Sequence, residues 1–77
     1  MALRSILAEN LKLLRSRRGL SQEELAAAAG IDRTYVSSLE REQYSVSIDT
    51  LERLSEALGV PAHELLQPKA AERPKKG

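Results

Sequence analysis

The segment Gln22–Leu39, with the sequence QEELAAAAGIDRTYVSSL, decides the fold of this chain. It predicts two short helices joined by a tight turn at residues 29–31, where Gly30 supplies a positive φ angle without the steric cost of a Cβ atom. Ala26 offers the small side chain that a closely crossing helix requires. The larger apolar residues are expected to face a common interior: Leu25, Ile31, Val36 and Leu39.

The solvent face of the second helix separates two interpretations of this segment. One is an ordinary αα-hairpin in a bundle, and the other is a helix-turn-helix whose second helix enters the major groove of DNA. The outer face of a helix that only faces solvent would more often carry Glu and Lys. A helix that contacts bases uses other residues: Arg binds guanine with two hydrogen bonds, and Thr offers both a hydroxyl and a methyl group. The pattern favours DNA binding, because the outward residues are Arg33, Thr34, Tyr35, Ser37 and Ser38.

Helix start and stop signals within and on both sides of this segment predict five helices and no strand. A leucine stripe at steps of four and three predicts a first helix that ends before Gly19. Good N-caps predict later helix starts at Ser21, Asp32 and Ser47, the first with a capping box to Glu24. A short fifth helix over residues 62–66 follows Pro61. Apolar pairs flank these four starts as hydrophobic staples: Leu20 with Leu25, Ile31 with Val36, Val46 with Leu51, and Val60 with Leu65.

Length and composition limit the classes of protein to consider. The chain has 77 residues, a formal net charge of +1, one His and no Cys. It is expected to form one all-α domain over residues 1–67, followed by a disordered basic tail over residues 68–77. No catalytic set or metal site can be assembled, so we expect no enzyme activity, no cofactor, no metal and no small-molecule ligand. The absence of a signal-peptide core and of a long apolar run predicts a cytoplasmic protein without a membrane segment.

The segments 20–26 and 30–41 resemble the Cro/phage-repressor class of helix-turn-helix regulators, and the similarity extends over about residues 7–66. The string Asp32-Arg33-Thr34-Tyr35, followed by Glu40-Arg41, is also similar to the controller proteins of restriction–modification systems. The resemblance implies a compact five-helix, repressor-like fold. It also implies a transcriptional regulator that binds a palindromic double-stranded DNA operator as a homodimer. The alternative is an antitoxin-like or protein-interaction module that docks through its acidic fourth helix.

The resemblance also assigns roles to individual residues. An ion pair between Arg15 and Glu40 is expected to join the first helix to the third, and the position of Arg15 beside the leucine stripe favours the same pair. The residues that match base-contacting positions, or lie beside them, are Arg33, Thr34, Tyr35 and Ser38. The candidates for phosphate binding are Arg17, Ser21, Gln22, Ser37, Arg41 and Tyr44.

The loop after the third helix departs from the family pattern. Glu42 stands where members often have Gly, Tyr44 where they often have Lys or Arg, and Val46 where they often have Pro. The acidic Glu42 thus replaces a flexible residue, and the aromatic Tyr44 replaces a positively charged one. We expect Tyr44 to donate its hydroxyl to a phosphate, whereas Glu42 would repel one unless it points away or binds a cytosine amino group.

The C-terminal half is expected to form the dimer interface, because a domain of this size gains stability from burying further apolar surface. The fifth helix is too short to bury both of its leucines in its own core. The alternative is that Leu66 only covers the first helix near Leu3 and Ile6. The candidate interface residues are Ile48, Leu54, Leu65 and Leu66.

Overall fold

The computed structural model describes residues 3–68, so nearly all of the predicted tail lies outside the described residues. Four α-helices are followed by a short 3-10 helix, and no strand occurs in this range. The elements are α1 (Leu3–Arg17), α2 (Gln22–Ala29), α3 (Arg33–Glu40), α4 (Ile48–Leu58) and η1 (Ala62–Leu66). The all-α prediction is confirmed, with the correction that the fifth element is a 3-10 helix.

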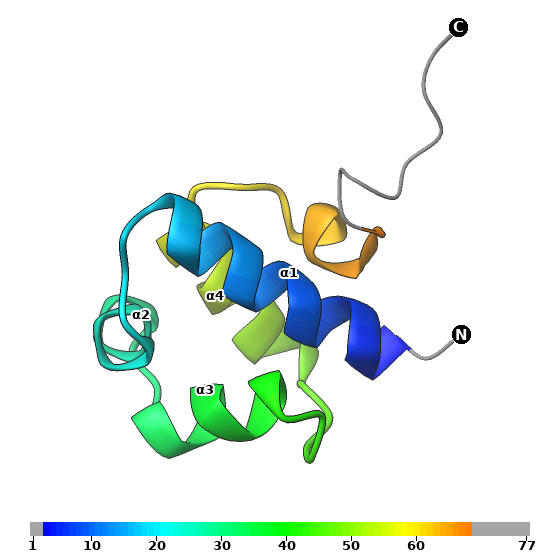
Figure 1. The fold of residues 1–77 in the computed structure, drawn as a ribbon, viewed down its shortest axis with the longest axis horizontal. Helices are drawn as coiled ribbons and strands as arrows, with labels where there is room; N and C mark the ends of the chain where they lie inside the picture. The colour runs from blue at the N-terminus through cyan, green and yellow to red at the C-terminus, as the bar shows by residue number, and fades with distance from the viewer. Residues whose placement is uncertain (1–2, 69–77) are drawn as a thin grey trace, which may run out of the picture.

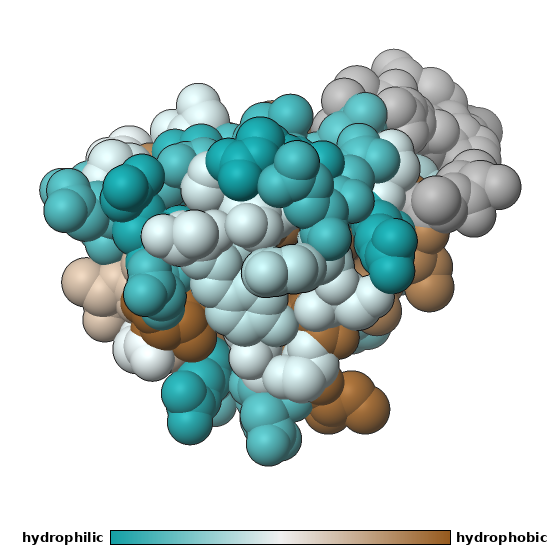
Figure 2. All heavy atoms as spheres, turned by 90° about the horizontal axis from the view of Figure 1, so that it is seen from below, coloured by the Kyte–Doolittle hydropathy of each residue, from teal (hydrophilic) through white to brown (hydrophobic). Residues whose placement is uncertain are grey.

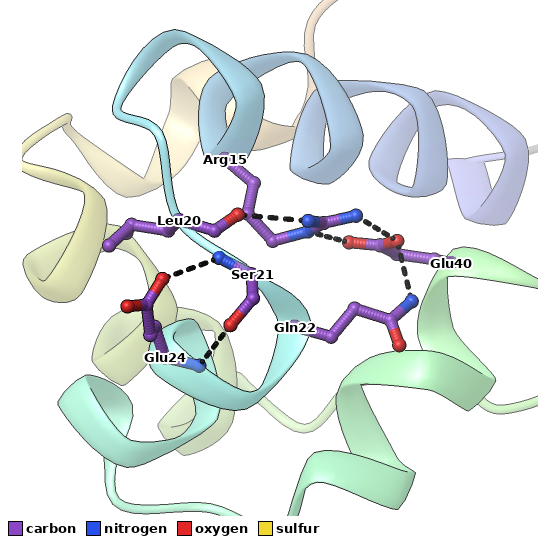
Figure 3. Close-up of polar contacts among 6 residues, drawn as sticks. All are labelled: Arg15, Leu20, Ser21, Gln22, Glu24 and Glu40. Carbon is purple, nitrogen blue, oxygen red and sulfur yellow. Dashed lines mark hydrogen bonds and ion pairs between the residues drawn. The ribbon is translucent and has the colours of Figure 1, made fainter.

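Local side-chain caps begin the helices at the predicted positions. The Ser21 hydroxyl accepts a hydrogen bond from the Glu24 amide at 3.0 Å, and the Glu24 carboxylate accepts one from the Ser21 amide at 2.9 Å (Figure 3). Asp32 and Ser47 cap α3 and α4 with their side chains, which accept hydrogen bonds from the Thr34 and Thr50 amides. Gly30 ends α2 with a φ of 73°, which a residue with a Cβ atom adopts only with strain.

The core lies where the helices meet. α2 packs against α3 and α4, α1 packs against α3 and η1, and η1 also contacts α4. In Figure 1, α3 forms the lower edge of the molecule and η1 lies at the opposite side. The fully buried large side chains come from all five elements: Leu11, Leu25, Val36, Leu39, Leu54, Leu58 and Leu65. α1 and α2 therefore pack against the inner face of α3, and its outer face stays exposed to solvent.

Burial corrects two of the predicted dimer contacts. Leu54 and Leu65 are each 0% exposed, so they belong to the core of the protomer and leave no surface for a partner. They are buried because η1 packs against both α1 and α4. Of the four candidates, Ile48 is 81% exposed and Leu66 is half-buried.

Two side chains of α1 and its C-terminal turn satisfy the carbonyl groups at the ends of later helices. The Asn10 amide nitrogen donates to the Leu65 and Gln67 carbonyl oxygens at 2.9 and 2.6 Å, and to that of Glu64 at 3.2 Å. The Arg18 guanidinium donates to the Leu58 carbonyl at 3.1 Å. Helix ends leave such carbonyls without intrahelical partners, so these contacts attach the C-terminal elements to α1.

Candidate nucleic-acid interface

The outer face of α3 carries most of the predicted base-contacting residues. Arg33 and Thr34 are exposed in its first turn, and Tyr35 is half-buried beside them. Ser38 is 6% exposed, so its short side chain faces the interior and cannot extend to a base. The prediction for Ser38 is therefore corrected, because α1 and α2 cover that side of α3.

A network of polar contacts sets the position of α3 relative to α1 and α2 (Figure 3). Arg15 Nε and Nη2 donate to the two carboxylate oxygens of Glu40 at 2.7 and 2.9 Å, and Arg15 Nη1 donates to the Leu20 carbonyl at 2.9 Å. The hydrogen bond that Arg15 donates to Glu40 raises the pKa of Arg15 above its ordinary value. The predicted ion pair is confirmed, and its bidentate geometry keeps both charges in place.

Gln22, at the start of α2, also joins this network. Its Nε2 donates to Glu40 Oε1 at 3.0 Å. The amide nitrogen carries two hydrogens, so one N–H remains for a phosphate after the bond to Glu40. The sequence had not predicted this contact, which ties the first residue of α2 to the last residue of α3.

The end of α3 holds a second group of polar residues. Arg41 is exposed, and its guanidinium donates to the Ser37 hydroxyl and to the Gln43 side-chain oxygen. These are neutral acceptors, so the positive charge of Arg41 is left available for an anion. The sequence pattern indicated Ser37 and Arg41 but not Gln43, which follows them in the loop.

The loop after α3 packs back against α3. Glu42 has a φ of 63°, the left-handed conformation for which family members often use Gly. The Tyr44 ring packs edge-on against that of Tyr35, with centroids 6.1 Å apart. The Tyr35 hydroxyl donates to the Ser45 carbonyl oxygen at 3.3 Å, and Arg4 Nη2 donates to the Ser45 hydroxyl at 2.8 Å. The sequence pattern gave no signal for the contact between Arg4 and Ser45, because the two residues are 41 positions apart.

These elements form one continuous surface around α3. Figure 2 views this side of the molecule, and hydrophilic or intermediate residues cover most of it, with the strongly hydrophobic ones mainly at its margins. The predicted phosphate-binding residues divide by exposure. Gln22 and Ser37 are half-buried, and the exposed members are Arg17, Ser21, Arg41 and Tyr44.

An apolar groove borders this surface at the N-terminus of α4. Its apolar walls come from α1, the loop before α4, α4 itself and η1: Leu3, Leu7, Val46, Ile48, Leu51 and Leu66. Arg4, Ser45 and Ser47 also line it. Leu66 thus lies beside α1, yet the groove next to it stays open. No described helix, within residues 3–68, is long and apolar enough to span a membrane.

The sequence and the fold match known proteins. A family model described as helix-turn-helix matches residues 11–65. A hypothetical transcription factor of Neisseria meningitidis is 48% identical over 66 residues, which cover 86% of this chain and 62% of that protein. Control protein C.SmaI of Serratia marcescens is 42% identical, with 86% and 79% covered. The crystal structure of the restriction–modification controller protein C.AhdI from Aeromonas hydrophila superposes with a TM-score of 0.78 at 40% identity, covering 80% and 94% of the two chains.

Proposed function

Because the chain belongs to the helix-turn-helix family of DNA-binding transcription regulators, we propose that it binds a palindromic operator as a homodimer and controls transcription there. The observation that carries the proposal is the first turn of α3, where Arg33 and Thr34 are exposed while the Arg15–Glu40–Gln22 network holds the helix from behind. A recognition helix needs this rigidity, because base contacts depend on sub-ångström placement of the side chains.

In this proposal, α3 enters the major groove. Arg33 donates two hydrogen bonds to a guanine, and Thr34 contacts a neighbouring base through its hydroxyl or methyl group. Phosphates on the two sides of the groove bind the N-terminus of α2 at Gln22 and the end of α3 at Arg41. Helix N-termini favour anions, because their first amide groups have no intrahelical partner.

The proposed dimer forms through the apolar groove at α4. Ile48 is 81% exposed at its rim, and an apolar side chain with that exposure favours burial against a partner. In a two-fold dimer, the Ile48 of each protomer contacts the groove of the other, with Leu66 beside it. Such a pair sets the two recognition helices about 34–36 Å apart, which is one turn of B-DNA.

The regulator class that we propose is a restriction–modification controller. The string Asp32-Arg33-Thr34-Tyr35 and the similarity to C.SmaI and C.AhdI support it. The gene that it controls would then encode a nuclease or methyltransferase of its own system. Operators selected by the purified protein from a random duplex pool, and then found upstream of such genes, test this assignment.

A combined measurement of assembly and DNA binding tests the dimer. We expect wild-type protein to sediment as a dimer and to bind full palindromes more tightly than half-sites. Ile48→Glu and Leu66→Glu should shift it to monomer and remove this preference. Ser16→Glu is the matched control, since it adds the same charge at an exposed position of α1 that lines a different hollow.

Two results would contradict the proposal. A wild-type chain that stays monomeric and binds half-sites as tightly as palindromes excludes the dimer. Duplex binding without a steep salt dependence excludes phosphate-driven DNA binding, and it would support the protein-interaction module as the alternative function.

A further inference from the structure

Arg4 lies at the junction between the DNA-facing surface and the apolar groove. It is exposed in the first turn of α1, and its Nη2 donates to the Ser45 hydroxyl at 2.8 Å. The carbonyl of the same Ser45 accepts the hydroxyl of Tyr35 on α3 at 3.3 Å. A single loop residue therefore joins Arg4 to the recognition helix.

The position of Arg4 in its own helix is electrostatically unfavourable. The N-terminus of a helix carries the positive end of the dipole, which favours acidic residues and disfavours cations. The first turn of α1 contains no acid, yet it contains Arg4. A charge that conflicts with its local element is expected at functional positions, where an interaction outside the element compensates for it.

The contact with Ser45 orients Arg4 without neutralising it. The acceptor is an uncharged hydroxyl, and a guanidinium has five N–H donors. Donors and charge are therefore left for an anion that approaches from solvent. Phosphate is the anion that this surface is expected to meet, because Ser45 also contacts Tyr35 on α3, the helix proposed to enter the major groove.

The location of Arg4 in the apolar groove indicates which part of the operator it would contact. Arg4 lines the same groove as Ile48 and Leu66, which is the surface of the proposed dimer, so this inference rests on the proposed function. Two copies that meet there bring both Arg4 side chains near the two-fold axis. The two-fold axis of the complex passes through the centre of a palindromic site.

We propose that Arg4 binds the DNA backbone at the centre of the operator, between the two half-sites. It positions the dimer and carries no base preference, unlike Arg33 on α3. The role extends the DNA-binding surface to the first turn of α1, whereas the DNA-contacting residues predicted from the sequence run from Arg17, at the end of α1, to Tyr44.

The test measures duplex binding over a range of salt concentrations for wild type, Arg4→Ala and Arg4→Lys. Arg4→Ala should weaken all operators by the same factor and reduce the salt slope by about one per protomer. Arg4→Lys should keep most of the slope. Lys12→Ala is the matched control on the same helix, because Lys12 lines a separate hollow with Glu9, Leu13 and Ser16, and it should leave the slope unchanged.

Neutral methylphosphonates locate the contact. Replacing the central phosphates should weaken wild-type binding and have little further effect on Arg4→Ala, whereas replacing flanking phosphates should weaken both proteins equally. Sedimentation of Arg4→Ala should still show a dimer. An unchanged salt slope, equal sensitivity of both proteins to the central replacements, or dissociation of the Arg4→Ala dimer would each overturn the assignment. If wild type dimerises and prefers palindromes, any of these three results overturns only the role of Arg4 and leaves the proposed function standing. If wild type does neither, both the proposed function and the role of Arg4 are overturned.

Discussion

The Glu40 carboxylate at the end of α3 accepts two hydrogen bonds from Arg15 on α1, at 2.7 and 2.9 Å. The Glu40 side chain is 4% exposed and that of Arg15 is 20% exposed. The acid is therefore the member of the pair that depends on its partner, since the guanidinium can still reach water. This asymmetry makes the two residues unequal in their effect on stability.

Arg15→Ala should lower the free energy of unfolding by about 2–4 kcal/mol, because it leaves a buried carboxylate with only the Gln22 amide as a side-chain partner. Glu40→Gln should cost less, since it removes the buried charge and keeps a hydrogen-bonding group. Urea denaturation measures both, with the exposed Arg17→Ala as control. Equal losses for Arg15→Ala and Arg17→Ala would contradict the prediction.

Asp32→Ala should destabilise the protein by about 0.5–2 kcal/mol, because the Asp32 carboxylate accepts the Thr34 amide at 2.8 Å in the first turn of α3. Asp32→Asn should preserve stability, since Asn is also a good N-cap. The thermal midpoint of each variant checks this. An unchanged midpoint for Asp32→Ala would mean that the cap does not stabilise α3.

Glu42→Gly should stabilise the protein by about 0.5–1 kcal/mol, because the φ of 63° at this position strains a residue with a Cβ atom, and the relief exceeds the entropy that Gly adds to the unfolded chain. Glu42→Ala removes the charge but keeps the strain. Both should increase DNA affinity if the carboxylate repels phosphates, whereas only Glu42→Gly should raise the thermal midpoint. If the thermal midpoint rises for Glu42→Ala and not for Glu42→Gly, the positive φ at residue 42 is not a source of strain.

Arg33→Ala should cost about 1–3 kcal/mol of binding and relax the preference at one base pair in each half-site. Arg41→Ala should weaken binding to all sequences alike and reduce the salt slope by about one. Binding to a panel of single-base operator variants separates these effects. If Arg33→Ala keeps the wild-type preference at every position, Arg33 does not contact a base.

Asn10→Ala should free the C-terminal turn, because the buried Asn10 amide is the side-chain partner of three carbonyl groups at and after η1. We expect a loss of about 1–3 kcal/mol and faster amide hydrogen exchange in residues 62–67 than in α3. Asn10→Asp, of the same shape but without the donors, should behave similarly. Uniform acceleration across the protein would indicate a global role instead.

The sequence by itself determined the helix boundaries, and it predicted α3 as the helix that contacts DNA. Caps such as Ser21 with Glu24, and Asp32 with Thr34, act between residues two or three positions apart. Their geometry follows from the local backbone alone, which is why they could be predicted without a tertiary structure. The outward residues Arg33 and Thr34 followed from the same helix register.

The tertiary structure alone decided which boundary residues are buried and which distant residues meet. Leu54 and Leu65 are buried because η1 packs against α4 and α1, and Ser38 is buried because α1 and α2 pack against α3. The contacts of Arg4 with Ser45 and of Asn10 with Leu65 join residues 41 and 55 positions apart. Such contacts form only after the whole core has brought the chain segments together, because no local interaction specifies the crossing of two helices.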